Sequence, residues 1–167
     1  MIKALDGLSK VLDKVKEAAK EKATDWRPAG IMEAAFLSDK IVFDQFDLKK
    51  QIQVATDNAK GGAARLAEIE IPVYEDNEQT VAELKARIQK TIDFVKSIKP
   101  EQVIGKEGIK VTLPYFPGKY FTGFEYVTGY LIPNFYFHVT TAYSIVRKNG
   151  IDIGKADYMN GQNLNDL

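Results

Sequence analysis

The sequence has no cysteine and only one histidine, His138, among its 167 residues. The absence of cysteine excludes disulfides, thiolate zinc sites and cysteine nucleophiles. A serine–histidine arrangement and a phosphate-binding loop are also missing from the sequence. Several common kinds of catalytic site are therefore excluded, and the chemistry left to consider centres on one imidazole.

The chain also has no excess of charge and no long apolar run. Its 23 basic and 23 acidic residues cancel, so no global field attracts nucleic acid or an anionic membrane, and only a local patch of charge could do so. No stretch approaches the roughly 20 apolar residues of a membrane-spanning helix, and the first residues lack the apolar centre of a signal peptide. We therefore expect a cytoplasmic protein without nucleic-acid or membrane partners.

The length predicts one domain over residues 1–167, with about residues 160–167 as a flexible polar tail. Three segments place apolar residues at spacings of three and four, the pattern of a helix with one buried face. The first covers residues 2–23, the second begins near Phe43, and the third starts after residue 80. Their apolar stripes are Leu5, Leu8, Leu12, Val15 and Ala19; Ile52, Ala55, Ala59, Ala63 and Leu66; and Val81, Leu84, Ile88, Ile92, Val95 and Ile98.

Local signals define several boundaries. Thr80 and Glu83 have the spacing of a capping box at the start of the third helix, and Pro100 ends it. Residues 26–39 show few periodic positions and are expected to form a connection. The adjacent pair Gly61 and Gly62 within the second helix predicts close packing against a neighbouring helix, because glycine otherwise weakens a helix interior.

Residues 108–121 alternate apolar and polar side chains around Pro117 and Gly118, which predicts a short β-hairpin. A fourth helix is expected from near Pro133 to just before Gly150. The preceding stretch FTGFEYVTGYL is interpreted as a short separate helix, kinked away by Pro133. Four helices with short connections predict an all-α antiparallel bundle.

His138 lies on the apolar face of this fourth helix, with Asn134 one turn before it and Thr141 one turn after it. Three interpretations follow. The imidazole is a buried polar group bonded to Asn134, a tyrosine or a backbone carbonyl; it is a general base in a pocket wall; or it is a metal ligand. A metal site needs at least two further ligands. Asp57 and Asp93 are candidates that could face the same interior, but the spacing of neither identifies a ligand pair.

Eleven aromatic side chains lie between Tyr115 and Tyr143. Such a concentration is compatible with a ligand cavity, and equally with a core and a dimer interface.

Two stretches carry a resemblance to a known family: FEYVTGYLIPNFYFHVTTAYSIVRKNGIDIGKADYMNG and QIQVATDNAKGGAARLAEIEIP. They resemble a bacterial domain of unknown function in the DinB/YfiT-like superfamily of four-helix bundles, and the similarity runs over nearly the whole chain. The resemblance implies an up-down bundle with a long crossover, commonly dimeric. Characterised superfamily members include thiol-dependent transferases and related metal-assisted enzymes.

Many superfamily members bind a divalent metal through a histidine on the second helix and a His-x-x-x-His pair on the last. His138 matches the second histidine of that pair, and Asn134 takes the place of the first. The position on the second helix falls near Gln53, with Asp57 one turn on. The resemblance thus implies a pocket here and no standard metal site; a metal, if bound, would be held by His138, Asn134, and Asp57 or Gln53.

Three functions remain open. The first is a homodimeric bundle protein that binds a small molecule between its helices; the pocket residues are His138, Asn134, Tyr130, Tyr136, Thr141, Gln53 and Asp57. The second is a metal-assisted transferase or hydrolase with His138 as the catalytic residue. The third is a structural interaction protein that uses exposed aromatics between Tyr115 and Phe124.

Overall fold

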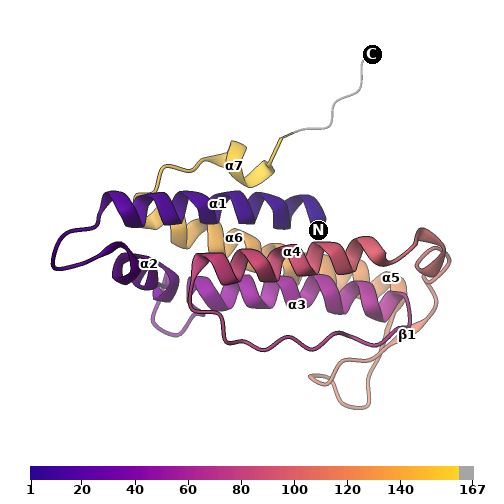
Figure 1. The fold of residues 1–167 in the computed structure, drawn as a ribbon. Helices are drawn as coiled ribbons and strands as arrows, with labels where there is room; N and C mark the ends of the chain where they lie inside the picture. The colour runs from indigo at the N-terminus through magenta and orange to yellow at the C-terminus, as the bar shows by residue number, and fades with distance from the viewer. Residues whose placement is uncertain (162–167) are drawn as a thin grey trace.

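A computed structural model describes residues 1–161 of the chain. Four long helices form a bundle: α1 (Ile2–Glu21), α3 (Leu48–Leu66), α4 (Val81–Ser97) and α6 (Ile132–Lys148) (Figure 1). The three predicted stripes and the apolar face of the fourth helix, which comprises Phe135, Val139, Ala142, Ile145 and Val146, meet in one core. Leu12, Ile52, Leu84 and Phe135 are fully buried in it. Each such side chain contributes roughly 1.5–3 kcal/mol by leaving water. The predicted all-α bundle is therefore confirmed, and its helices follow from amphipathic periodicity.

A long crossover, residues 67–80, connects α3 to α4 (Figure 1). It runs back along α3, because Asp76 pairs with Lys50 near the start of that helix and Tyr74 lies under Lys60 near its end. The helix α4 therefore begins at the same end of the bundle as α3, and these two helices are parallel. The crossover implied by the resemblance is confirmed, whereas short connections alone would have made these neighbours antiparallel.

The predicted connection at residues 26–39 is wrong, because it contains a helix, α2 (Ala29–Ser38). Only Phe36 and Leu37 of this helix are buried, so its apolar residues form no regular stripe. Its helix-favouring alanines, Met32 and Glu33 were the available signal. The next helix, α3, begins at Leu48 rather than near Phe43, and the side chain of its N-cap residue accepts a backbone hydrogen bond.

The glycine pair in α3 was expected to mark close helix packing. A Cβ atom at Gly62 would lie 2.5 Å from both terminal carbons of Leu131, a distance that atoms do not adopt without displacement. Gly62 therefore allows α3 to approach the segment before α6. At Gly61 the nearest atom is 2.6 Å away and belongs to the flexible end of Arg65.

The predicted hairpin consists of β1 (Lys110–Val111) and β2 (Phe121–Thr122), which pair antiparallel. Two strands of this length are not stable alone. Val111 and Leu113 instead pack on Tyr126 and Leu131 in a small second core, which attaches the hairpin to the bundle.

The chain then enters α5 (Gly123–Glu125), a π-helical segment η2 (Tyr126–Leu131), and α6 without interruption. The separate helix expected before Pro133 is thus wrong. The π-helical segment directly before the proline alters the α-helical hydrogen-bond register, so the helix accommodates a residue without an N–H group. Pro133 lies in the first turn of α6, where the prediction placed it.

Two short helical elements complete the described fold, η1 (Pro100–Gln102) and α7 (Lys155–Met159). The latter packs on α1, and the Nδ2 atom of Asn160 donates to the Lys3 carbonyl and to Asp6. Residues 162–167 of the expected flexible tail lie outside the described residues. Within residues 1–161, no helix combines the length and the apolar composition that a membrane crossing requires.

Candidate functional site

The imidazole of His138 is buried at the interface between α3 and α6, with 7% of the residue exposed. Its Nδ1 atom lies 2.7 Å from Oε1 of Gln51 on α3. Burial lowers the pKa of His138 below its usual value, which favours the neutral ring at physiological pH. An amide oxygen only accepts, so the neutral ring carries its proton on Nδ1 and donates it to Gln51.

The second ring nitrogen, Nε2, is consequently the acceptor atom of the imidazole. Among the described residues, Oε1 of Gln45 is the one buried side-chain nitrogen or oxygen that lacks a partner. The Nε2 atom therefore retains contact with solvent or with a polar neighbour. The partner of Nδ1 is Gln51, not the Asn134, tyrosine or backbone carbonyl that the sequence suggested.

A second polar pair lies further along the same interface. Nδ2 of Asn134 donates to Oδ1 of Asn58 at 2.9 Å. The antiparallel packing of α3 and α6 brings residues 51 and 138 together, and likewise residues 58 and 134. The α3–α6 interface thus contains one imidazole and three carboxamides.

These side chains, taken as potential metal ligands, do not fit the divalent metal that the resemblance implies. The proposed ligands His138 and Asn134 each already bond a side chain of α3, and carboxamides are poorer ligands for zinc or nickel than imidazole, thiolate or carboxylate. Within residues 1–161, no group of three histidine, aspartate or glutamate side chains is placed to hold an ion. We therefore assign no chemistry to a metal at this interface.

The remaining proposed ligands, Gln53 and Asp57, lie on a different side of α3. Each residue turns an α-helix by about 100°, so residue 53 lies about 200° around the helix from Gln51. Nε2 of Gln53 donates to Glu78 at 2.8 Å, and Asp57 contacts Arg87 at 2.7 Å. The structure places both residues under the crossover and away from His138.

Arg87 of α4 is the centre of this second polar region and is only 4% exposed. Its Nε atom donates to the Thr56 hydroxyl at 2.7 Å, and its Nη1 atom donates to Glu78 at 3.0 Å. Its Nη2 atom donates to Asp57 at 2.7 Å and lies 3.1 Å from Asp76. We call Arg87 and these carboxylates the crossover network, because they attach residues 75–78 to α3 and α4.

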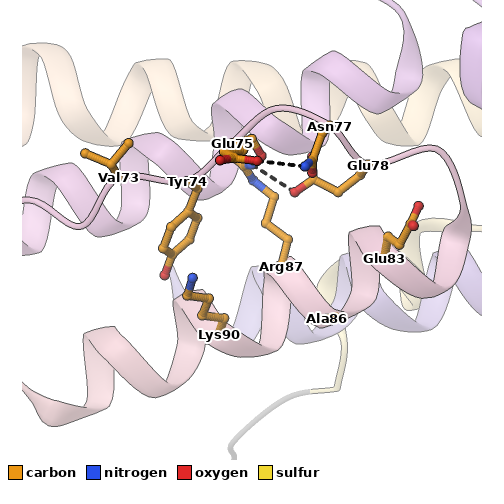
Figure 2. A pocket seen from close by; sticks show the side chains of 9 residues that line it. All are labelled: Val73, Tyr74, Glu75, Asn77, Glu78, Glu83, Ala86, Arg87 and Lys90. Atoms are coloured by element: carbon orange, nitrogen blue, oxygen red, sulfur yellow. Dashed lines mark hydrogen bonds and ion pairs between the residues drawn. The ribbon is translucent and has the colours of Figure 1, made fainter.

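Tyr74 adds an aromatic ring to the same region. Lys60, Arg87 and Lys90 place their charged groups 4.7, 5.3 and 4.3 Å from the centre of this ring, within the range of cation–π attraction. Figure 2 shows Arg87 and Lys90 rising from α4 towards the crossover, beside a hollow of about 500 Å³. Burial raises the pKa of Tyr74, so the ring remains a neutral phenol. The three cations around it join the crossover to α3 and α4.

A larger hollow, of about 620 Å³, lies where α3 meets η2, the start of α6 and the hairpin. We call it the tyrosine groove. Its lining includes Asp57, Asn58, Arg65, Tyr126, Tyr130 and Asn134. The rings of Tyr126 and Tyr130 are stacked with their centres 5.9 Å apart. Burial raises the pKa of both tyrosines, so the groove presents neutral phenols next to carboxamides and charged groups.

The predicted pocket residues are thus only partly brought together. Tyr130, Asn134 and Asp57 line the tyrosine groove, and Asp57 is also part of the crossover network. Gln53 lies outside the groove and donates to Glu78 of that network. His138 lies one helical turn beyond Asn134. Two further predicted residues lie outside the groove: Tyr136, which is 40% exposed, and Thr141, whose hydroxyl donates to the Phe137 carbonyl at 2.7 Å.

Sequence reasoning missed Gln51, Asn58, Arg65 and Arg87. A signal existed for Arg87, because it lies between Leu84 and Ile88 on the apolar face of α4, where a charged residue needs a buried partner. No comparable signal in the sequence marked the carboxamides of Gln51 and Asn58. Their role depends on which face of α3 meets α6.

Comparisons with known proteins agree with this fold. A family model described as Domain of unknown function (DUF1993) matches residues 1–159. A crystal structure of a DinB family member protein from Shewanella denitrificans is 34% identical in sequence, with a TM-score of 0.89; the match covers 99% of this chain and 90% of that chain. No curated protein matches the sequence significantly.

Proposed function

The chain belongs to the DUF1993 family of domains of unknown function and has a DinB-like helical-bundle fold, and on this premise we propose that it binds a small organic molecule in the tyrosine groove. The observation that carries the proposal is the composition of this hollow. Two stacked tyrosines, a pair of carboxamides and a guanidinium from α3, η2 and α6 converge on about 620 Å³. The lining also contains the charged side chains Lys50, Asp57, Lys60 and Asp76. Aromatic surface beside placed polar groups, in a volume of roughly 300–1,000 Å³, is typical of ligand pockets.

The polar groups have unused hydrogen-bonding capacity. The bond between Asn134 and Asn58 occupies one donor and one acceptor, and Nδ2 of Asn58 also donates to the Val54 carbonyl at 3.0 Å. Each carboxamide has two donor hydrogens and an acceptor oxygen, so one donor hydrogen of each and the Asn134 oxygen remain for a ligand. The phenol of Tyr130 is neutral and adds a donor and an acceptor. A ligand with a ring and one or two polar substituents therefore suits the groove better than a simple ion or an aliphatic chain.

A fragment titration observed by amide NMR tests this proposal. Neutral and charged ring fragments should shift the backbone amides of Tyr126, Tyr130 and Asn134, and Tyr130→Ala should weaken the binding. Tyr136→Ala is the matched control, because Tyr136 is a tyrosine nearby in the same helical run but outside the groove. Fragments that leave every groove amide unshifted at millimolar concentration would refute the proposal.

A second candidate function is general base catalysis by His138. The observation in its favour is the orientation of the ring: Gln51 holds Nδ1 at 2.7 Å, which leaves Nε2 as an acceptor on a neutral imidazole. A broad screen of hydrolase and thiol-transferase substrates, with wild type and His138→Gln compared, tests this role. Turnover that persists unchanged in the variant excludes His138 as the base.

We also propose that the protein forms a homodimer. The support is a run of exposed apolar side chains before α3, in which Phe43 exposes 91% of its surface and is flanked by Ile41, Val42 and Phe46. Large apolar side chains gathered at the surface commonly mark an interface. Sedimentation velocity at micromolar concentration should give a dimer, and Phe43→Ser should shift it towards monomer; a wild-type monomer would contradict this proposal.

A further inference from the structure

Arg65 occupies the wall between two hollows. One is the tyrosine groove, and the other, of about 580 Å³, lies under the hairpin. We call the second one the hairpin groove; Lys110, Phe116, Lys119 and Tyr120 are among the residues that line it. Arg65, Ile71 and Leu113 line both hollows. The two hollows therefore adjoin along these three residues, of which Arg65 alone is charged.

The charged side chains that line the hairpin groove are all cationic, namely Arg65, Lys110 and Lys119. None of these three forms an ion pair with a carboxylate in the part of the chain that the structure describes. This is unusual in a chain whose 23 basic and 23 acidic residues balance. The hairpin groove therefore has a local positive potential, which attracts anions. In the adjoining tyrosine groove, the carboxylates of Asp57 and Asp76 are paired with Lys60 and Lys50.

Arg65 has the capacity to bind such an anion. The hydrogen bond recorded for its side chain joins Nη1 to the Tyr126 hydroxyl at 3.4 Å, which is long for an N–H···O bond. A guanidinium has five N–H donors in a planar fork that matches a carboxylate or a phosphate. Arg65 is half-buried, so a contact there is less screened by water than one on an exposed lysine.

Aromatic rings lie on both sides of Arg65. The Tyr126 hydroxyl that meets Arg65 belongs to the ring that stacks on Tyr130 with 5.9 Å between centres. On the other side, the Lys110 ammonium lies 4.9 Å from the centre of the Tyr120 ring. Stacking surface on one side and positive charge on the other thus flank a single guanidinium.

From this arrangement we infer that the two grooves form one site for a planar organic anion. Its ring lies against Tyr130 in the tyrosine groove, and its carboxylate or phosphate binds Arg65. Lys110 and Lys119 attract the anion and bind any further negative charge. This inference rests on the proposed ligand-binding function and specifies the chemical class of the ligand.

The test is an NMR titration at physiological salt with four probes: benzoate, phenyl phosphate, inorganic phosphate, and benzamide as the neutral isostere of benzoate. We expect at least one of the two ring anions to bind roughly tenfold more tightly than benzamide, the difference that a charge-assisted fork provides. The stronger of the two identifies the anionic group. Inorganic phosphate should bind weakly, since it has no ring for Tyr130.

Two substitutions at Arg65 isolate its contribution. Arg65→Gln should lower the affinity for the ring anion about tenfold and leave benzamide binding unchanged, while Arg65→Lys should give an intermediate affinity because it keeps the charge and loses the fork. Lys22→Gln removes an exposed charge at the C-cap of α1 and should change neither affinity, because that end of α1 lies away from the hairpin (Figure 1). Circular dichroism of each variant verifies that the fold is retained.

The outcomes separate this inference from the proposed function. If benzamide binds in the groove as tightly as the anions, or if the preference survives Arg65→Gln, the anion inference is wrong while small-molecule binding stands. The anion inference is also wrong if inorganic phosphate binds wild type and Arg65→Gln equally and added salt abolishes that binding, because exposed lysines alone explain such an effect. If no probe of either charge shifts a groove amide, both proposals fail.

Discussion

Replacement of Arg87 by methionine should strongly destabilise the protein. The guanidinium contacts the Thr56 hydroxyl, the Glu75 carbonyl and three carboxylates. Removing one partner of a buried ion pair typically lowers the free energy of unfolding by about 3–5 kcal/mol, because the other charge remains buried without compensation. A domain of ordinary stability has only about 5–15 kcal/mol in total.

The size of the effect follows from the carboxylates that remain. Asp57 and Asp76 are partly exposed and keep the cations Lys60 and Lys50 as partners. Glu78 is only 8% exposed and would retain only the hydrogen bond from Gln53 among the side-chain contacts recorded for it. The loss therefore comes mainly from Glu78, which places the expected change near the lower end of the range, about 3 kcal/mol.

Urea unfolding followed by circular dichroism measures this change. Lys85→Met is the matched control, because Lys85 is on the same helix and pairs with Asp13 at the surface, where an ion pair contributes about 0–1 kcal/mol. Adding Glu78→Gln to Arg87→Met removes the uncompensated charge and should restore at least about 1 kcal/mol. A loss below about 1 kcal/mol for Arg87→Met, or no recovery in the double variant, would refute this account of the crossover network.

Three further predictions concern packing, pH and capping. Gly62→Ala should lower the free energy of unfolding by about 1–3 kcal/mol, since the new Cβ would lie 2.5 Å from Leu131 carbons; Gly30→Ala, which meets nothing within 4 Å, should be neutral or stabilising in the same assay. Burial lowers the folded pKa of His138 below 6.5, so the unfolded state binds more protons, and this contribution to stability is complete above pH 6.5 and decreases as the pH falls towards the folded pKa. His138→Gln should therefore flatten the pH dependence of urea unfolding between pH 7.5 and 5, and an unchanged slope would contradict the assignment. Thr80→Ala removes the capping hydrogen bond of α4 and should cost about 1 kcal/mol, whereas serine at that position should preserve stability.

The two residues of α6 that the resemblance would make metal ligands, Asn134 and His138, both form side-chain hydrogen bonds to α3. Asn134 bonds Asn58, and His138 bonds Gln51. These polar side chains join α3 to α6. The proposed organic ligand and its anionic group lie beside this interface, in the tyrosine groove and at Arg65.

The helices could be predicted wherever a stripe of apolar residues recurs with helical spacing. The stripes of α1, α3, α4 and α6 were found from sequence, and so was the capping box at Thr80. The helix α2 was missed because it buries only Phe36 and Leu37. Pro133 was read as a break because local rules for proline do not include a preceding π-helical segment.

The site was less predictable for a geometric reason. Placing His138 on the inner face of α6 required only its own helix, and it is buried as expected. Identifying its hydrogen-bond partner required knowing which face of α3 is turned towards α6. The side chains of Gln51 and Gln53 project about 200° apart around that helix. Counting residues along the chain pointed to Gln53, which is on the same helix as Gln51 but faces the crossover and not His138.

The sequence by itself therefore determined the helices that bury an apolar stripe, the hairpin, and the inward position of His138, because each depends on the periodicity or turn chemistry of one segment. The tertiary structure decided the parallel course of α3 and α4, the pairing of Gln51 with His138, and the convergence of Arg87 with Glu78. These features depend on the relative rotation and direction of helices far apart in the chain. That arrangement is set by packing of the whole core, and no single segment encodes it.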